Sequence, residues 1–404
     1  MEGFVRRADR LPIDELVLLD TDAERLAIVG GLAQRMLDRL DWVGRLRLTG
    51  DRDSAIDGAD FVLIQLRVGG QATRLVDETL PPRFGVIGQE TTGAGGFAKA
   101  LRTIPVVLEL AELTGRRAAP RAWIVDFTNP VGIVTQALLD AGHRALGLCN
   151  VAINIQRTIA GRLGVPAERV ELEHVGLNHL SWERAARVDG VDRLPGLLER
   201  DGEWLADHVG MPVELVRALG AVPSYYLHYY YETAKVVSEQ RNGHTRAQDV
   251  IDIEARLLDL YRDQGLAEKP ALLADRGGAY YSEAAAQLIA SLYDGAGDLQ
   301  VVDMRNDGAL PDLPESAVVE IAARIDRDGA HAVPLAPLAP EMRGLVQAAK
   351  AYEELTIEAA LSGDRRTALR ALIANPLVGE WAIAAPLLDA LLDADRAHLP
   401  RFFG

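Results

Sequence analysis

The sequence predicts an α/β protein, in which a Rossmann-like, doubly wound parallel sheet is followed by a mostly helical α+β domain. Strand-like and helix-like segments alternate over residues 1–165, which is typical of a parallel sheet with helices on both faces. Helical segments dominate from residue 166 onward. A length of 404 residues allows two or three domains of ordinary size. We therefore divide the chain into residues 1–165 and 166–404.

Apolar spacing predicts the individual elements. Short apolar runs predict strands at 16–20, 59–66, 122–127 and 144–149. Helical periodicity predicts helices at 22–40, 97–113, 131–141 and 153–163. In the second domain, an antiparallel strand pair is expected at 170–179 and 181–188. Further helices are expected at 213–219, 247–262 and 282–292, with three more between 341 and 392.

The composition disfavours several classes of function. With 43 Lys+Arg against 59 Asp+Glu the formal net charge is −16, and nucleic-acid binding depends on Lys/Arg contacts with phosphate. No apolar run is long enough for a membrane span, and no secretory signal is visible. Cys149 is the single cysteine, so an internal disulfide cannot form and a cytoplasmic location is expected.

Asp20 ends the first predicted strand, where a dinucleotide-binding fold carries the acid that binds the ribose 2′-hydroxyl. The phosphate-binding glycine loop of such a fold lies about 20 residues earlier, which here falls at or before Met1. We therefore expect the first strand and its glycine loop to be encoded upstream of Met1. A surface acid with no ligand is the alternative for Asp20. The relaxed glycine pattern Gly93-x-Gly95-x-x-Ala98 is more simply a tight turn entering a helix.

Two side chains in the middle of the chain could share a divalent ion. Cys149 follows a predicted parallel strand, where such sheets bind ligands, and His179 ends the strand that opens the second domain. Each alone is more often a core residue. Together they offer a thiolate and an imidazole, and two protein ligands leave positions open for a substrate.

Other candidate residues lie at strand ends or in an aromatic cluster. Residues 223–231 (PSYYLHYYY) hold five of the ten tyrosines, which form either a packing ridge or a site where one phenol is a base near a metal. Arg67 follows the strand at 59–66, and Arg246 precedes a helix; each could bind phosphate or carboxylate. The amide of Asn129 could bind a sugar hydroxyl.

These segments, in this order, resemble the NAD- and metal-dependent glycoside hydrolase family 4, and within it the 6-phospho-beta-glucosidases. The motifs that carry the resemblance are FVRRADRLP (4–12), LVLLD (16–20), QLRVGG (65–70), GQETTGAGGF (88–97), TNPV (128–131), GLCNV (147–151), GLNHL (176–180), PSYYL (223–227) and TRAQDV (245–250). No single motif is specific, but the combination is.

The resemblance implies a role for each candidate. Cys149 and His179 would hold the divalent metal, usually Mn²⁺, and the match to the family's Ser-x-Tyr-Leu makes Tyr226 the base. The first domain would bind NAD, and the residues implied to contact it are Asp20, Arg67 and Asn129. The residues implied to contact the phosphosugar are Arg67, Asn129, Asn150 and Arg246.

The reaction that the resemblance implies is hydrolysis of a 6-phospho-beta-glucoside without a pair of catalytic carboxylates. NAD takes hydride from C3 of the sugar, which acidifies the proton on C2. Tyr226 removes that proton while the metal polarises the oxygens at C2 and C3, and the aglycone leaves. Water addition and reduction at C3 restore NAD. The expected substrate is a phosphorylated disaccharide or aryl glycoside, and the expected assembly is a homodimer or homotetramer.

Two alternatives belong to other classes. A 2-hydroxyacid dehydrogenase of the lactate or malate type would share the cofactor domain but would use no metal. A truncated, non-catalytic family member would be only a structural subunit. The Cys149–His179 pair and the tyrosine cluster favour the hydrolase.

Overall fold

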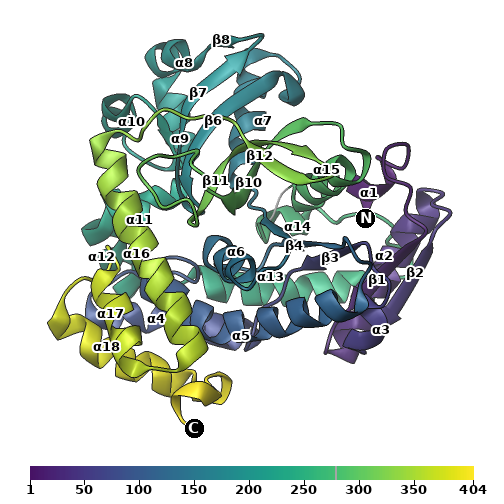
Figure 1. The fold of residues 1–404 in the computed structure, drawn as a ribbon, viewed down its shortest axis with the longest axis horizontal. Helices are drawn as coiled ribbons and strands as arrows, with labels where there is room; N and C mark the ends of the chain where they lie inside the picture. Colours follow the sequence, from purple (N-terminus) through teal and green to yellow (C-terminus); the bar gives the residue numbers. More distant parts are fainter. Residues whose placement is uncertain (278–279) are drawn as a thin grey trace.

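A six-stranded sheet with the order β12-β11-β10-β5-β4-β3 forms the centre of the molecule (Figure 1). The computed structural model describes residues 1–277 and 280–404. The parallel strands are β3 (Phe61–Ile64), β4 (Trp123–Asp126) and β5 (Ala145–Gly147). The antiparallel strands are β10 (Asp298–Arg305), β11 (Val318–Asp326) and β12 (Gly329–Ala332). Strands from both sides of residue 165 therefore build one sheet, and the division into two domains at that point stays a prediction.

A separate parallel pair is formed by β1 (Glu15–Leu19) and β2 (Arg45–Thr49), connected by α2 (Ala23–Arg39). This unit lies at the right edge of Figure 1, beside β3. Asp22 caps α2 by accepting a hydrogen bond from the Arg25 amide. The strand at 16–20 and the helix at 22–40 are confirmed to within a residue or two. The strand β2 was not expected from the sequence.

The predicted helices around the parallel strands are confirmed, with ends that differ by up to four residues. They are α5 (Gly93–Arg117), α6 (Val131–Asp140) and α7 (Val151–Leu163), and the short helices α1 (Glu2–Val5), α3 (Arg52–Ile56) and α4 (Gly70–Thr79) complete this half. Helix α5 contains Pro105 and continues past it. Helix α7 ends where Gly164 takes a left-handed φ of 67°, which glycine adopts at no steric cost.

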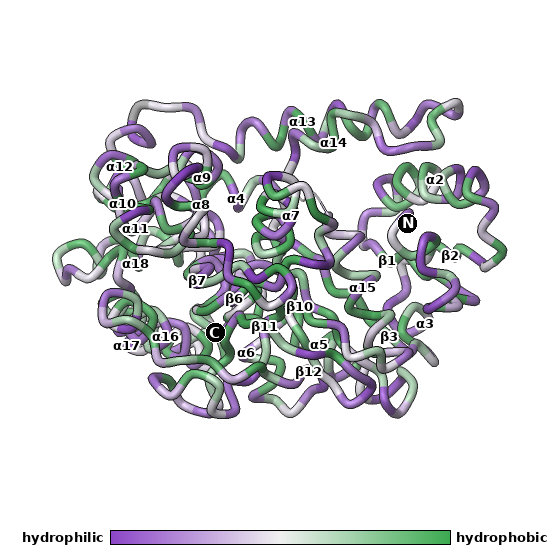
Figure 2. Tube along the Cα trace, turned by 90° about the horizontal axis from the view of Figure 1, so that it is seen from above, coloured by the Kyte–Doolittle hydropathy of each residue, from purple (hydrophilic) through white to green (hydrophobic). Residues whose placement is uncertain are grey.

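The second half begins with a long antiparallel pair, β6 (Val170–Leu177) and β7 (Leu180–Val188), as predicted. Short strands β8 (Val191–Asp192) and β9 (Val222–Pro223) extend it. The helices that follow are α8 (Leu194–Arg200), α9 (Gly202–Val209), α10 (Val213–Leu219), α11 (His228–Tyr231), α12 (Thr233–Asn242), α13 (Arg246–Tyr261), α14 (Leu272–Asp275) and α15 (Tyr281–Asp294). Helix α13 lies at the outside of the molecule and alternates hydrophilic and hydrophobic segments (Figure 2).

Three strands of the second half, β10 to β12, were overlooked by the sequence analysis. The first six residues of β11 are all buried, so the strand lacks the alternation of polar and apolar residues that marks a half-exposed strand. The three C-terminal helices are confirmed as α16 (Pro340–Ser362), α17 (Arg365–Ala374) and α18 (Trp381–Ala394). No helix within the described ranges is long and apolar enough to cross a membrane.

A buried ion triad ties the C-terminal region to the parallel half. The Arg102 guanidinium on α5 donates to Asp77 of α4 at 3.0 Å and to Asp395, which follows α18, at 2.8 Å. Its Nε also donates to the Val68 carbonyl at 3.2 Å, in the loop that follows β3. All three charged side chains are buried. Arg102 thus holds in place the loop that carries Arg67.

We expect Arg102→Met to lower the free energy of unfolding by about 3–5 kcal/mol, because it leaves two buried carboxylates without their cation. Arg52→Met is the matched control. It removes an exposed ion pair with Glu109, so its effect should stay below about 0.5 kcal/mol. Urea denaturation followed by tryptophan fluorescence measures both. Equal midpoints for the two variants would contradict a stabilising role for the triad.

Candidate metal centre

Three candidate residues follow neighbouring parallel strands. Arg67 lies just after β3, Asn129 just after β4 and Cys149 just after β5, and these strands are adjacent in the sheet. Since the carboxyl ends of parallel strands meet at one edge, the three residues lie along the same edge, where open α/β sheets bind ligands. Asn150 comes next in the chain and is the N-cap of α7.

Cys149 and His179 meet at this edge. His179 lies in the turn between β6 and β7, with a left-handed φ of 64°, and its Nε2 is 3.5 Å from Cys149 Sγ. For comparison, the bonds of a tetrahedral zinc site, about 2.3 Å to sulfur and 2.1 Å to nitrogen, place the two ligand atoms about 3.6 Å apart. The donor types and their separation therefore fit two ligands of one ion.

Burial sets the protonation of both candidate ligands. Burial lowers the pKa of His179 to about 4, so its imidazole is neutral near pH 7. Burial, followed by the negative charges of Glu320 and Asp303, raises the pKa of the Cys149 thiol well above its usual value. The thiolate thus needs a bound cation for its stabilisation, whereas the imidazole can accept a metal without losing a proton.

Tyr226 covers the imidazole. Its ring stacks on His179 with centroids 3.6 Å apart and an angle of 15° between the planes. Tyr225 is the next ring, at 4.4 Å. Burial and the neighbouring Tyr225 raise the pKa of Tyr226 well above its usual value. A phenol at this position can therefore act as a base only beside a cation.

The rest of the tyrosine cluster includes packing residues. Tyr231 accepts a hydrogen bond from the indole of Trp182 at 3.3 Å, and both Tyr230 and Tyr231 pack against the core. Tyr226 packs against the same core, so packing against the core does not by itself separate the members of the cluster.

A buried ionic cluster that was not expected from the sequence lies next to the site. Glu90 is paired with Arg67, with Lys99 at 2.6 Å and with Arg74 at 3.6 Å. Although burial alone would raise the pKa of Glu90, the charges of Lys99, Arg67 and Arg74 hold it well below its usual value. Arg74 also pairs with Glu78 at 2.8 Å. Within this cluster, three cations thus face two carboxylates. The only signal for this cluster in the sequence is the motif GQETTG.

The remaining candidates differ in their surroundings. The buried Oδ1 of Asn129 accepts no hydrogen bond from the described residues, which suits an atom that awaits a ligand. Arg246 is exposed at the first turn of α13, where it donates to the Asp275 carbonyl. Asp20 directly follows β1 of the separate β1–β2 sheet, and its carboxylate accepts from the Asp22 amide at 3.0 Å. The structure therefore brings Cys149 and His179 together, whereas Asp20 follows a strand of another sheet.

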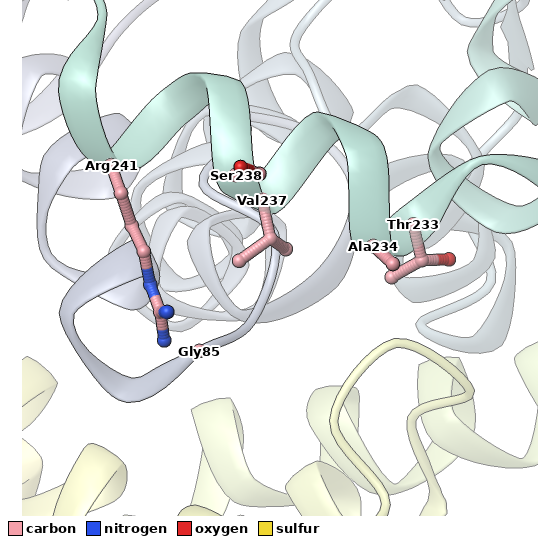
Figure 3. Close-up of a pocket in the computed structure, with 6 residues that line it drawn as sticks. All are labelled: Gly85, Thr233, Ala234, Val237, Ser238 and Arg241. Atoms are coloured by element: carbon pink, nitrogen blue, oxygen red, sulfur yellow. The ribbon is translucent and has the colours of Figure 1, made fainter.

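The structure also bears on larger groups of metal ligands and on cavities near the site. Among the described residues, no group of three or more His, Cys, Asp or Glu side chains is arranged to hold a metal. A cavity of about 20 Å³, roughly the size of a single water, lies beside His179. A larger surface pocket of about 520 Å³ lies along α12, between Thr233 and Arg241 (Figure 3). None of the predicted site residues lines that larger pocket.

Comparison with known proteins agrees with this geometry. The family described as "Family 4 glycosyl hydrolase" matches residues 1–165, and "Family 4 glycosyl hydrolase C-terminal domain" matches residues 174–378. The chain belongs to glycosyl hydrolase family 4. The resemblance seen in the sequence and the predicted fold class are thereby confirmed.

Particular relatives lie within the phospho-glucosidases. The chain is 41% identical to a probable 6-phospho-beta-glucosidase of Bacillus subtilis, covering 100% of this chain and 94% of the relative. The 6-phospho-beta glucosidase of Thermotoga maritima, solved with manganese, NAD⁺ and glucose-6-phosphate, is 33% identical. Its TM-score is 0.93, with 98% of this chain and 95% of that chain covered. Malate dehydrogenase of Plasmodium falciparum, at 16% identity and a TM-score of 0.53, shares the fold alone.

The affinity of the protein for Mn²⁺ should rise about tenfold per pH unit between about pH 6 and 8. The thiol of Cys149 is protonated over this range because its pKa is raised, so binding must release its proton. His179 contributes no proton because its pKa of about 4 lies below the range. Electron paramagnetic resonance of free Mn²⁺ gives the affinity. Cys149→Ser should bind weakly and lose this slope, whereas an affinity independent of pH in the unaltered protein would contradict thiolate ligation.

Proposed function

We propose that this chain hydrolyses 6-phospho-beta-glucosides with the help of NAD and a divalent metal, Mn²⁺. The observation that carries the proposal is the convergence of a thiol, an imidazole and a phenol at the carboxyl edge of the sheet. Its family membership and its relatives, which are named 6-phospho-beta-glucosidases, support the same activity.

The proposed metal ligands and base divide the work between them. When bound, NAD supplies a reversible hydride acceptor and the metal polarises neighbouring sugar oxygens. Cys149 and His179 hold the metal. Tyr226, stacked on His179, takes the proton from C2 of the sugar. Its raised pKa makes this transfer dependent on the cation, so the base is active only in the loaded site.

The proposed cofactor and substrate contacts follow the strand ends. Arg67 and Asn129 follow β3 and β4, at the sheet edge where their side chains could contact either a dinucleotide or a sugar. Asp20 directly follows β1. We assign Asp20, Arg67 and Asn129 to NAD. The residues assigned to the phosphosugar are Arg67, Asn129, Asn150 and Arg246. The Oδ1 of Asn129, which accepts no hydrogen bond from the described residues, supports its place in the site.

The wider setting is part of the same proposal. The substrate is a phosphorylated disaccharide or aryl glycoside, and the enzyme works in the cytoplasm, where its single cysteine stays reduced. We propose a homodimer or homotetramer. Residues 1–165 form the NAD-binding domain, and residues 166–404 form the domain for metal binding and assembly.

Hydrolysis of a chromogenic 6-phospho-beta-glucoside tests the activity. The purified protein should release the chromophore only with NAD, Mn²⁺ and a reductant together, since Cys149 must remain able to form a thiolate. The unphosphorylated glucoside and the 6-phospho-alpha-glucoside are matched controls. Net NADH accumulation with a 2-hydroxyacid, unaffected by a chelator, would instead indicate a dehydrogenase. Turnover that survives the combined change Cys149→Ser and His179→Ala would overturn the metal assignment.

Tyr226→Phe tests the base. It removes the hydroxyl but keeps the ring that stacks on His179, so Mn²⁺ binding should be retained. Exchange of the C2 proton with solvent should slow by about 10²- to 10⁴-fold, the usual contribution of general base catalysis. Proton NMR of product formed in D₂O measures the exchange. Unchanged exchange in Tyr226→Phe and a loss in Tyr225→Phe would move the base to Tyr225.

A further inference from the structure

We propose that Gln89 and Thr91 are positioning residues that hold His179 in the one neutral tautomer able to bind a metal through Nε2. The inference rests on the proposed function, because it concerns how the ligand of the proposed metal is prepared. Both residues belong to the segment GQETTG, which precedes α5.

The two ring nitrogens of His179 have different partners. The Oγ1 of Thr91 lies 2.9 Å from Nδ1, and Cys149 Sγ lies 3.5 Å from Nε2. Thr91 and His179 are both buried, so bulk water does not compete for these contacts. Since a neutral imidazole carries a single N–H, the partner of Nδ1 decides whether Nε2 keeps its lone pair.

The direction of the Thr91 hydrogen bond follows from Gln89. The Gln89 Oε1 accepts from the backbone amides of Thr91 and Thr92 at 2.6 and 2.7 Å, which identifies this atom as the carbonyl oxygen of the side chain. The Thr91 hydroxyl lies 2.8 Å from the same oxygen. A carbonyl oxygen can only accept, so the single hydroxyl proton points to Gln89. Thr91 Oγ1 must then accept from Nδ1–H, which leaves the lone pair of Nε2 facing Cys149.

Glycines bring this segment close to the first turns of α5. A Cβ at Gly95 would lie 2.3 Å from the backbone carbonyl oxygen of Gln89, and one at Gly96 would lie 2.5 Å from the backbone carbonyl group of Thr91. Gln240 of α12 fixes the start of the segment by bonding both the N–H and the C=O of Gly88, at 2.9 and 2.7 Å. The glycine pattern at 93–98 thus has a role without phosphate: it lets the loop approach closely enough for Thr91 to reach His179.

The other side of the imidazole is fixed by Tyr226, whose ring is stacked on it. Stacking sets the plane of the ring but does not distinguish one nitrogen from the other. The Gln89–Thr91 pair supplies that distinction. Groups that orient a metal-ligating histidine through its second nitrogen commonly change metal affinity by about 10- to 100-fold when they are removed.

Metal binding by three single variants tests the inference. Thr91→Val removes the hydroxyl with little change of shape and should weaken Mn²⁺ binding by about 10- to 100-fold. Thr91→Ser keeps the hydroxyl and should restore most of the affinity. Thr103→Val is the matched control, because Thr103 is a buried threonine of α5 whose hydroxyl has no hydrogen-bond partner among the described residues. Wild-type affinity in Thr91→Val, measured by paramagnetic resonance of free Mn²⁺, would overturn the proposal.

The tautomer can be observed directly in the metal-free protein. Long-range ¹H–¹⁵N spectra of ¹⁵N-histidine-labelled protein distinguish Nδ1–H from Nε2–H, and the His179 signals are assigned as those lost in His179→Gln. We expect Nδ1–H in the unaltered protein and in Thr91→Ser. An Nε2–H tautomer in the unaltered protein would refute the inference even if Thr91→Val failed to fold.

The two tests separate this inference from the proposed function. An Nδ1–H tautomer together with weakened Mn²⁺ binding in Thr91→Val supports the inference, even if no phosphoglucoside is hydrolysed. Conversely, the protein could hydrolyse the substrate with Mn²⁺ while Thr91→Val binds the metal normally. That result would support the proposed activity and refute the positioning role of Thr91.

Discussion

The site depends on the 3.5 Å approach of Cys149 Sγ to His179 Nε2 in a region closed to bulk water. The two residues come from different halves of the chain, one after β5 and the other from the turn between β6 and β7. Burial affects them in opposite ways, since it keeps the imidazole neutral and the thiol protonated. A bound divalent cation would favour the thiolate of Cys149, while the imidazole of His179 would stay neutral. The same desolvation explains why Tyr226 needs that cation to act as a base.

Two buried acidic residues, Asp303 and Glu320, lie on β10 and β11, the two strands that follow β5 in the sheet, and influence the charge of the Cys149 thiol. Gly147 pairs in register with Asp303, which pairs with Glu320 on the next strand. Glu320 accepts from the Asn178 amide at 3.0 Å, directly before His179 in the chain, and also contacts His174 at 2.9 Å. Buried negative charge near a thiol opposes thiolate formation when no metal is bound, and favours the arrival of a cation. Glu320 therefore links the sheet to the turn that carries His179.

Local sequence signals predicted β1, β3, β4, β5 and the longer helices of the parallel half through their apolar spacing, but not β2 or the short helices. The sequence also suggested Cys149 and His179 as a pair, although only Cys149 lies at the carboxyl end of a parallel strand and His179 lies in the turn of an antiparallel pair. Strand β11 was missed because burial of its first six residues removes the alternation that marks a half-exposed strand. The ionic cluster of Glu90 with Lys99 was missed for another reason. Its partners lie on a loop and a helix whose contact depends on tertiary packing, which no spacing rule describes.

The glycine-rich segment at 93–98 shows that a short glycine motif does not by itself identify what its backbone lies close to. Glycines allow a backbone to come close to something, and a dinucleotide is only one such partner. Here the close partner is the protein's own loop at 88–92, and the contact distances to the Gln89 and Thr91 carbonyl groups leave no space for a Cβ. Under the proposal for Thr91, the motif serves the metal centre by letting this loop pack closely against α5. On that proposal, two glycines in one helix help to decide which nitrogen of a histidine in the β6–β7 turn carries the proton.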